Sequence, residues 1–168
     1  PLAYTYSRYK IEPVAIPSVT PGAPPLPTLS AATSQEYSLM TWNVENLFDT
    51  LEPHPSDPPM PLPSEYQAEL TKVASTIQAA GFPIIIGLQE VENIGVLNSI
   101  AAHPLLAAYD YQTVLFEGDD SRGIDVGFLV RSDRATIIDA EPRPAPEGLF
   151  SRPPLVLQVQ VETDDGQV

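Results

Sequence analysis

The chain has 168 residues, of which 43% are hydrophobic, and this suits one domain, or parts of two, with a buried core. It contains no cysteine, which excludes a disulfide framework, a thiol nucleophile and a cysteine-based zinc site. Its net charge of -14 argues against a broad basic surface that follows a nucleic-acid backbone, although a metal-centred phosphate site stays open.

Proline divides the chain into segments. Many of the 20 prolines gather in residues 17–27 and 53–63, where the fixed φ and the missing amide donor favour extended loops. Residues 1–13 alternate like a single strand, which we interpret as the exit strand of an upstream module, and residues 14–36 as a Pro-rich linker. The organised domain is expected to cover residues 37–168. Because no apolar run or leader reaches membrane-spanning length, we interpret the chain as a soluble fragment or a processed chain without membrane contact.

A strand, a helix and a second strand are predicted to open this domain. Strand formers favour strands over residues 37–42 and 83–91. Ser64 and Gln67 form the pattern of a capping box, and Gly81 followed by proline ends the helix. One helical face is apolar and contains Tyr66, Leu70, Val73, Ala74 and Ile77.

The second half is expected to be mostly strands. A weaker helix is predicted over residues 94–102, with Asn93 as its N-cap. Strand patterns then cover residues 111–117, 124–130, 135–140 and 154–161. The acidic run at 164–166 predicts a tight hairpin. Because almost no returning strand follows, we expect the chain to stop mid-domain, and the alternative is an edge strand with a frayed end.

Polar side chains lie at the ends of apolar strand segments, where sheet proteins commonly place sites. Period two puts Asn43 and Glu45 on one side of their strand, and Glu90 ends the neighbouring buried strand. Oxygen ligands of this kind suit a hard cation such as Mg2+ or Mn2+. Arg122 and Arg152 are candidates to hold phosphate oxygens. The alternative is that each carboxylate ends a strand in solvent and each arginine pairs with an acid on an acidic surface.

Four segments in chain order, "TWNVENLFDT", "IIGLQEVEN", "RGIDVGFLVR" and "FSRPPLVLQV", closely resemble the endonuclease/exonuclease/phosphatase superfamily. The resemblance covers about residues 37–168. It is nearest to bacterial secreted nucleases, with more distant similarity to pancreatic deoxyribonuclease, abasic-site endonucleases and neutral sphingomyelinases. It implies an α/β fold, the four-layer α/β sandwich of the deoxyribonuclease-like type, present here as the N-terminal half of the domain.

The resemblance also implies a metal site. Glu90 matches the principal metal ligand of the family, and Asn43 matches a residue that helps to hold the metal and the attacked phosphate. Glu45 corresponds to an outer position of the metal shell. The implied cofactor is Mg2+, with Mn2+ or Ca2+ as alternatives.

Further residues match the phosphate side of the site, and some family motifs are missing. Arg122 and Asp125 match the segment that borders the scissile phosphate, and Arg152 resembles a phosphate-contacting arginine. The catalytic His, the Asp-x-Asn motif and the closing Asp-His pair of the family have no counterpart. His54 and His103 match no family motif and are interpreted as bystanders. The chain alone is therefore expected to be inactive, with the missing C-terminal half of the domain, on the same or a second chain, as its partner.

The expected function is phosphodiester hydrolysis by a secreted, extracellular bacterial nuclease that cleaves DNA, with RNA as an alternative substrate. A nucleic-acid-binding β-barrel is the expected upstream neighbour. Two other functions stay open. A phosphatase or a sphingomyelinase-type phosphoesterase of the same fold suits the acidic charge, and a non-catalytic binding module fits the missing motifs.

Overall fold

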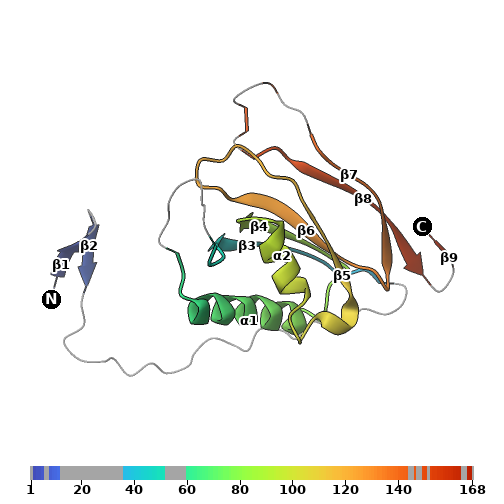
Figure 1. Cartoon of the computed structure of the whole chain (residues 1–168), viewed down its shortest axis with the longest axis horizontal. Helices are drawn as coiled ribbons and strands as arrows, with labels where there is room; N and C mark the ends of the chain where they lie inside the picture. The colour runs from blue at the N-terminus through green and yellow to red at the C-terminus, as the bar shows by residue number, and fades with distance from the viewer. Residues whose placement is uncertain are drawn as a thin grey trace.

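The computed structural model describes residues 2–5, 8–11, 36–51, 60–143, 146, 149–150, 152–163 and 166–167. A four-stranded sheet has the order β3-β4-β6-β5, and a second sheet has the order β7-β8-β9. The strands are β3 (Leu39–Leu47), β4 (Ile85–Val91), β5 (Tyr111–Leu115), β6 (Asp125–Arg131), β7 (Ala135–Pro142), β8 (Leu155–Thr163) and β9 (Gly166–Gln167). The helices are α1 (Pro63–Ala79), α2 (Ile94–Ala101) and the short 3-10 helix η1 (Ala107–Tyr109). Figure 1 shows α1 and α2 on one side of the four-stranded sheet and the strands β7 and β8 on the other.

The predicted strand-helix-strand unit is confirmed, because β3 and β4 run parallel and α1 connects them. All five residues of the predicted apolar face of α1 are buried. The predicted cap is wrong: α1 begins at Pro63, and Ser64 lies inside its first turn. Proline needs no N–H partner and has a φ suited to the first helical position. The helix therefore starts at Pro63, before the predicted cap residue Ser64. The Glu65 side chain then accepts a hydrogen bond from the Leu62 N–H, 2.8 Å away.

The predicted N-cap of the second helix, α2, is confirmed. Asn93 is the N-cap of α2, and its Oδ1 accepts from the Val96 N–H at 3.0 Å, which satisfies one of the donors that a helix N-terminus exposes. Its Nδ2 donates to the Asp49 carboxylate at 3.2 Å. This amide therefore ties the loop after β3 to the helix after β4.

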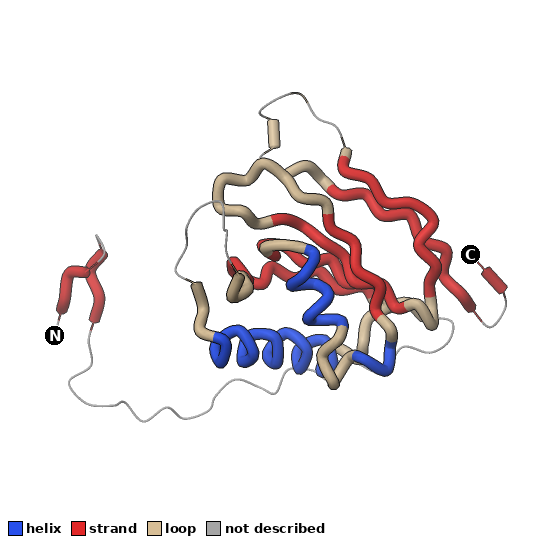
Figure 2. Tube along the Cα trace, in the orientation of Figure 1, coloured by secondary structure: helices blue, strands red, loops and turns tan. Residues whose placement is uncertain are grey.

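Two hydrophobic clusters hold the layers together. Figure 2 shows these layers, with the helices in blue and the strands in red. Alternate residues of β4 divide between them. Ile86 and Leu88 are fully buried with the apolar faces of α1 and α2, whereas Ile85 packs toward β7 and β8. Each fully buried Ile or Leu contributes about 1.5–3 kcal/mol, so both faces of this strand fix its position. A rigid β4 matters because Glu90 lies near its end.

Two expectations about the ends of the chain need correction. β1 (Leu2–Thr5) and β2 (Arg8–Ile11) are two strands that pair antiparallel, in place of the expected single strand, because their backbone groups bond to each other. After β8, the two-residue β9 pairs with Glu162 and Thr163, so a returning strand does begin. The predicted turn at 164–165, the linker at 14–35 and His54 lie outside the described residues. No described helix is long and apolar enough to cross a membrane.

Candidate metal and phosphate site

The end of β3 has an irregular backbone that shapes one wall of the site. Glu45 and Asn46 have φ values of 58° and 54°, and the pairing with β4 shifts between Asn43 and Leu47. The Asn43 Oδ1 accepts from the Glu45 N–H at 2.9 Å, which stabilises this turn of the chain. Period two therefore does not explain how Asn43 and Glu45 lie, contrary to the sequence interpretation. Non-glycine residues with positive φ carry backbone strain, and such residues concentrate at functional sites.

Glu90 comes from the neighbouring strand and has the same backbone irregularity. Its φ is 66°, and the pairing of β4 with β6 shifts between Gln89 and Val91. The Glu90 Oε2 accepts from the Asn46 N–H at 3.2 Å. The side chain of Glu90 is only 17% exposed, so this carboxylate is held against the end of β3.

Both strand ends open into one cleft with a volume of about 980 Å³. The Arg122 Nη1 lies 3.9 Å from the Glu90 Oε1 in this cleft. Four of the candidate residues line it together: Asn43, Glu45, Glu90 and Arg122. Three other polar residues of the lining were not predicted from the sequence: Asn46, Glu69 and Lys72. The helical period of α1 could have placed Glu69 and Lys72 on a face beside the strand ends.

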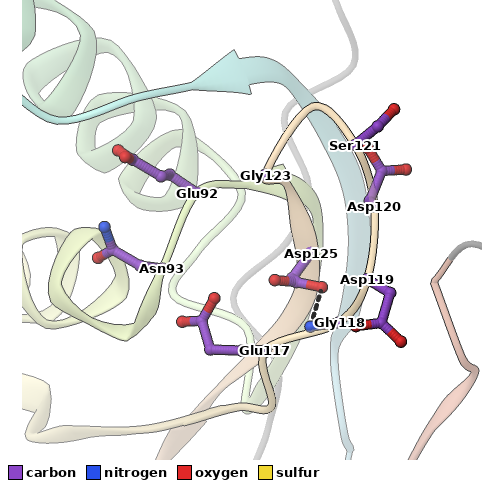
Figure 3. Close-up of a pocket in the computed structure, with 9 residues that line it drawn as sticks. All are labelled: Glu92, Asn93, Glu117, Gly118, Asp119, Asp120, Ser121, Gly123 and Asp125. Carbon is purple, nitrogen blue, oxygen red and sulfur yellow. Dashed lines mark hydrogen bonds between the residues drawn. The ribbon is translucent and has the colours of Figure 1, made fainter. Parts of the chain in front are cut away.

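Asp125 lies elsewhere, contrary to the expectation that it borders the same site. It belongs to a second cavity of about 570 Å³, which Figure 3 shows with the acidic side chains around it. Asp125 is 3% exposed, and its Oδ1 accepts from the Gly118 N–H at 3.0 Å. Burial, with a smaller contribution from the negative charge of Glu117, raises the pKa of Asp125 to about 6. Asp125, the first residue of β6, therefore lines this second cavity and is not among the residues that line the cleft of Glu90.

Arg152 reaches the site region through a residue that the sequence analysis missed. Its Nε lies 3.4 Å from the Asp120 Oδ2, while Arg122 approaches the Asp120 Oδ1 with its Nε at 3.4 Å and its N–H at 2.9 Å. The hydrogen bond from the Arg122 backbone holds the pKa of Asp120 below its usual range, and the positive charges of both arginines add to this. The only local signal for Asp120 is the aspartate-turn pattern of "DSR", with the bond two residues on.

Comparison with known proteins gives the family. Residues 38–165 match the model of the Endonuclease/Exonuclease/phosphatase family. The chain belongs to this family. A solved structure of humanized D. rerio TDP2 with 14 mutations is 20% identical, with a TM-score of 0.50, over 78% of this chain and 44% of that chain. The human Nocturnin catalytic domain with bound sulfate anion is 16% identical, with a TM-score of 0.46, over 77% and 46%. No curated protein sequence matches.

These findings establish the fold and leave the substrate open. The likeness to TDP2 shows that the α/β layers follow the nuclease-like fold of the endonuclease/exonuclease/phosphatase family. The chain spans less than half the length of the solved chains that it resembles. Members of the family generally use divalent metal ions.

The cleft of this endonuclease/exonuclease/phosphatase chain offers oxygen donors that fit a hard cation. No group of three or more His, Cys, Asp or Glu side chains within the described residues could hold a metal by itself. Mg2+ is commonly bound through one or two carboxylates, with water and substrate phosphate completing its shell. The carboxylates of Glu90 and Glu45 and the amide oxygen of Asn43 are therefore ligands of the types that Mg2+ binds.

The raised pKa of Asp125 gives a prediction for stability. A folded-state pKa of about 6, against an ordinary value of 3.8, means that ionisation disfavours the folded state. This destabilisation is absent below the ordinary pKa of 3.8; the free energy of unfolding falls as pH rises from there to about 6 and then levels off. Two pKa units correspond to about 3 kcal/mol. Asp125→Asn keeps an acceptor for Gly118 and should raise the free energy of unfolding at pH 8 by up to about 3 kcal/mol more than at pH 4.

Urea unfolding of both proteins at the two pH values measures this difference. Asp133→Asn is the matched control, because the hydrogen bond from Arg131 lowers the pKa of Asp133. Its loss of stability should be greatest at pH 8 and should shrink as the pH falls below 4. A pH-independent effect of Asp125→Asn would show that this carboxylate ionises normally in the folded protein.

Proposed function

We propose that this chain contributes the metal and phosphate side of a Mg2+-dependent phosphodiester hydrolase that cleaves DNA. The observation that carries the proposal is the cleft in which Asn43 and Glu90, from two adjacent strand ends, meet Arg122. A carboxylate, an amide oxygen and a guanidinium at this spacing can bind a cation and an anion side by side. A phosphodiester with a bound divalent cation has this pair of charges.

Each residue has a defined part in the proposed reaction. Glu90 and Asn43 bind Mg2+, and Glu45 lies at the edge of the same oxygen set. The bound ion supplies Lewis-acid polarisation of the phosphoryl oxygen and stabilises charge on the leaving oxygen. Arg122 binds a phosphate oxygen, and its positive charge offsets the negative charge that grows on the phosphate as water attacks. Arg152 assists from the neighbouring loop.

The base that deprotonates the attacking water is proposed to come from outside these 168 residues. The chain has only two histidines, neither in a family motif. One surface supports a partner: Leu39 is 71% exposed beside an apolar groove of about 320 Å³ that includes Ile85 and Phe128. We propose that the C-terminal half of the domain covers this groove and supplies the base, from the same or a second polypeptide.

The substrate is proposed to be DNA, with RNA as the alternative. An acidic protein can bind a nucleic acid locally at a metal ion without a long basic groove. Small phosphoesters and sphingomyelin need no such groove either, so they are the second substrate class to test. Secretion from a bacterium is a further proposal, supported by the resemblance to secreted nucleases, and detection of the protein in the culture medium would test it.

Plasmid nicking tests the proposed function. The longest open reading frame that encodes this chain should nick plasmid DNA with Mg2+ and should lose this activity with EDTA. The isolated chain should show no nicking. Hydrolysis of sphingomyelin or of a phosphate monoester, with the plasmid left intact, would replace the nuclease proposal. Absence of any phosphoester hydrolysis in the longer protein would favour a binding module.

A further inference from the structure

A single buried carboxylate connects Arg122, which lines the cleft, with Arg152, which is not among the lining residues. Asp120 lies in the loop between β5 and β6 and is 8% exposed. One of its oxygens contacts Arg122, two residues away, and the other contacts Arg152, which precedes β8. Arg122 extends further, with its Nη1 3.9 Å from Glu90. The three residues therefore form a connected series that ends at the candidate metal ligand.

We propose that Asp120 is a positioning residue that holds the guanidinium groups of Arg122 and Arg152 as a pair facing one phosphodiester. This inference rests on the proposed function and assigns Asp120 no direct contact with the substrate. Two arginines close together repel each other, and each loses side-chain entropy when it is held in place. A carboxylate that contacts both offsets the repulsion and restricts both side chains before the substrate arrives. A guanidinium has five N–H donors, so an arginine held through Nε can still present its Nη groups to a phosphate.

One mutation distinguishes a positioning role of Asp120 from a purely electrostatic one, because the two roles predict opposite changes in the affinity for a phosphodiester. Asp120→Asn removes a negative charge near the place where an anion binds, and by charge alone this should strengthen binding of a phosphodiester. If Asp120 positions the two arginines, the same change should weaken binding. Asp119→Asn is the matched control, because Asp119 is the exposed neighbour in the same loop and the charge change is identical.

The experiment uses the full chain with Mg2+ and the dinucleotide d(TpT) as the phosphodiester probe. Asp120→Asn should raise the Kd for d(TpT) about tenfold, the size of one charge-assisted hydrogen bond, whereas Asp119→Asn should leave it unchanged or lower it. In nitrogen-15 spectra, the Nε–H resonances of Arg122 and Arg152 should both move toward solvent-exposed values in Asp120→Asn and should stay in place in Asp119→Asn. Arg152→Ala should weaken binding of d(TpT) by the native chain. In a chain that already carries Asp120→Asn, the same substitution should weaken binding little further.

Each outcome decides the proposal. Binding by Asp120→Asn that is as tight as binding by Asp119→Asn would overturn it, because the carboxylate would then act only through its charge. If Asp120→Asn does not fold, Asp120→Glu replaces it: the charge is unchanged and the carboxylate is displaced by one methylene, so weaker binding of d(TpT) would come from lost positioning, and unchanged binding would overturn the proposal. If the native chain does not bind d(TpT) at all, the proposed function is contradicted, whereas the pairing of the two arginines by Asp120 is judged separately. The Nε–H spectra distinguish that case, because they report the pairing of the arginines without substrate.

Discussion

Glu90→Gln is expected to lower the affinity of the chain for Mg2+ or Mn2+ by at least about 100-fold, the upper end of the losses seen when groups that support a metal ligand are removed. The loss of affinity should come from removal of the negative charge of Glu90. Glutamine keeps an oxygen that can accept from the Asn46 N–H, so the contact between the two strand ends is preserved. The substitution removes the negative charge that would bind the cation, and with it the long ion pair of Glu90 with Arg122 at 3.9 Å. In a protein that contains the whole domain, turnover should fall to background. Titration calorimetry with Mn2+ and the plasmid assay measure the two effects.

Glu69→Gln provides the control for Glu90→Gln. Glu69 lines the same cleft and makes an ion pair with Lys72 at 2.5 Å, so its replacement removes the same charge from the same wall. Its effect on metal affinity should stay within about threefold, as expected for an exposed charge at this site. Near-normal cleavage by Glu90→Gln at saturating Mg2+ would disprove the assignment of Glu90 as a ligand.

Gly127→Ala is expected to destabilise the fold by about 2–3 kcal/mol, a typical cost of overpacking a core. A Cβ at this position would lie 2.5 Å from the Leu97 Cδ1 and 2.9 Å from the Val114 carbonyl oxygen. The Leu97 side chain could rotate away. The Val114 oxygen belongs to the backbone of β5, the strand paired with β6, so it can move only if the sheet changes. Urea unfolding of the variant measures the loss.

Gly87→Ala is the matched control for Gly127→Ala, because it introduces the same methyl group into the adjacent central strand. There the nearest atom is the Phe128 Cε1 at 3.2 Å, at the edge of a ring that can shift. The loss of stability should be clearly smaller than for Gly127→Ala. Equal losses at both positions would mean that strand propensity, rather than the close approach of β5, makes glycine necessary at 127.

Hydrophobic periodicity predicted most of the fold because burial on one face is a local property of the sequence. The five apolar positions of α1 are all buried, and Asn93 caps α2 as its side-chain chemistry suggested. The failures arose where local rules compete. Pro63 overrode the Ser64 capping pattern, and the alternation of residues 1–13 does not distinguish one strand from two strands that pair with each other.

The candidate site was predictable in part, for a related physical reason. Asn43 and Glu90 lie where the regular pairing of two neighbouring parallel strands breaks, so their convergence follows from topology. The positive φ values at Glu45 and Glu90 were not predictable, since irregular backbone at strand ends depends on tertiary packing. Asp125 was expected in the site from the motif, but β6 directs it into another cavity. Asp120 was missed because its second partner, Arg152, lies 32 residues further along the chain.

Line broadening by Mn2+ in amide spectra of the 168-residue chain tests the central claim most directly, since paramagnetic broadening falls steeply with distance from the ion. If the cation binds in the cleft, substoichiometric Mn2+ should broaden the amide signals of Asn43, Glu45 and Glu90 first, and Glu90→Gln should abolish this pattern. Broadening centred on Glu117 and Asp125 would contradict it, because the cation would then bind in the acidic cavity and not in the cleft between the strand ends.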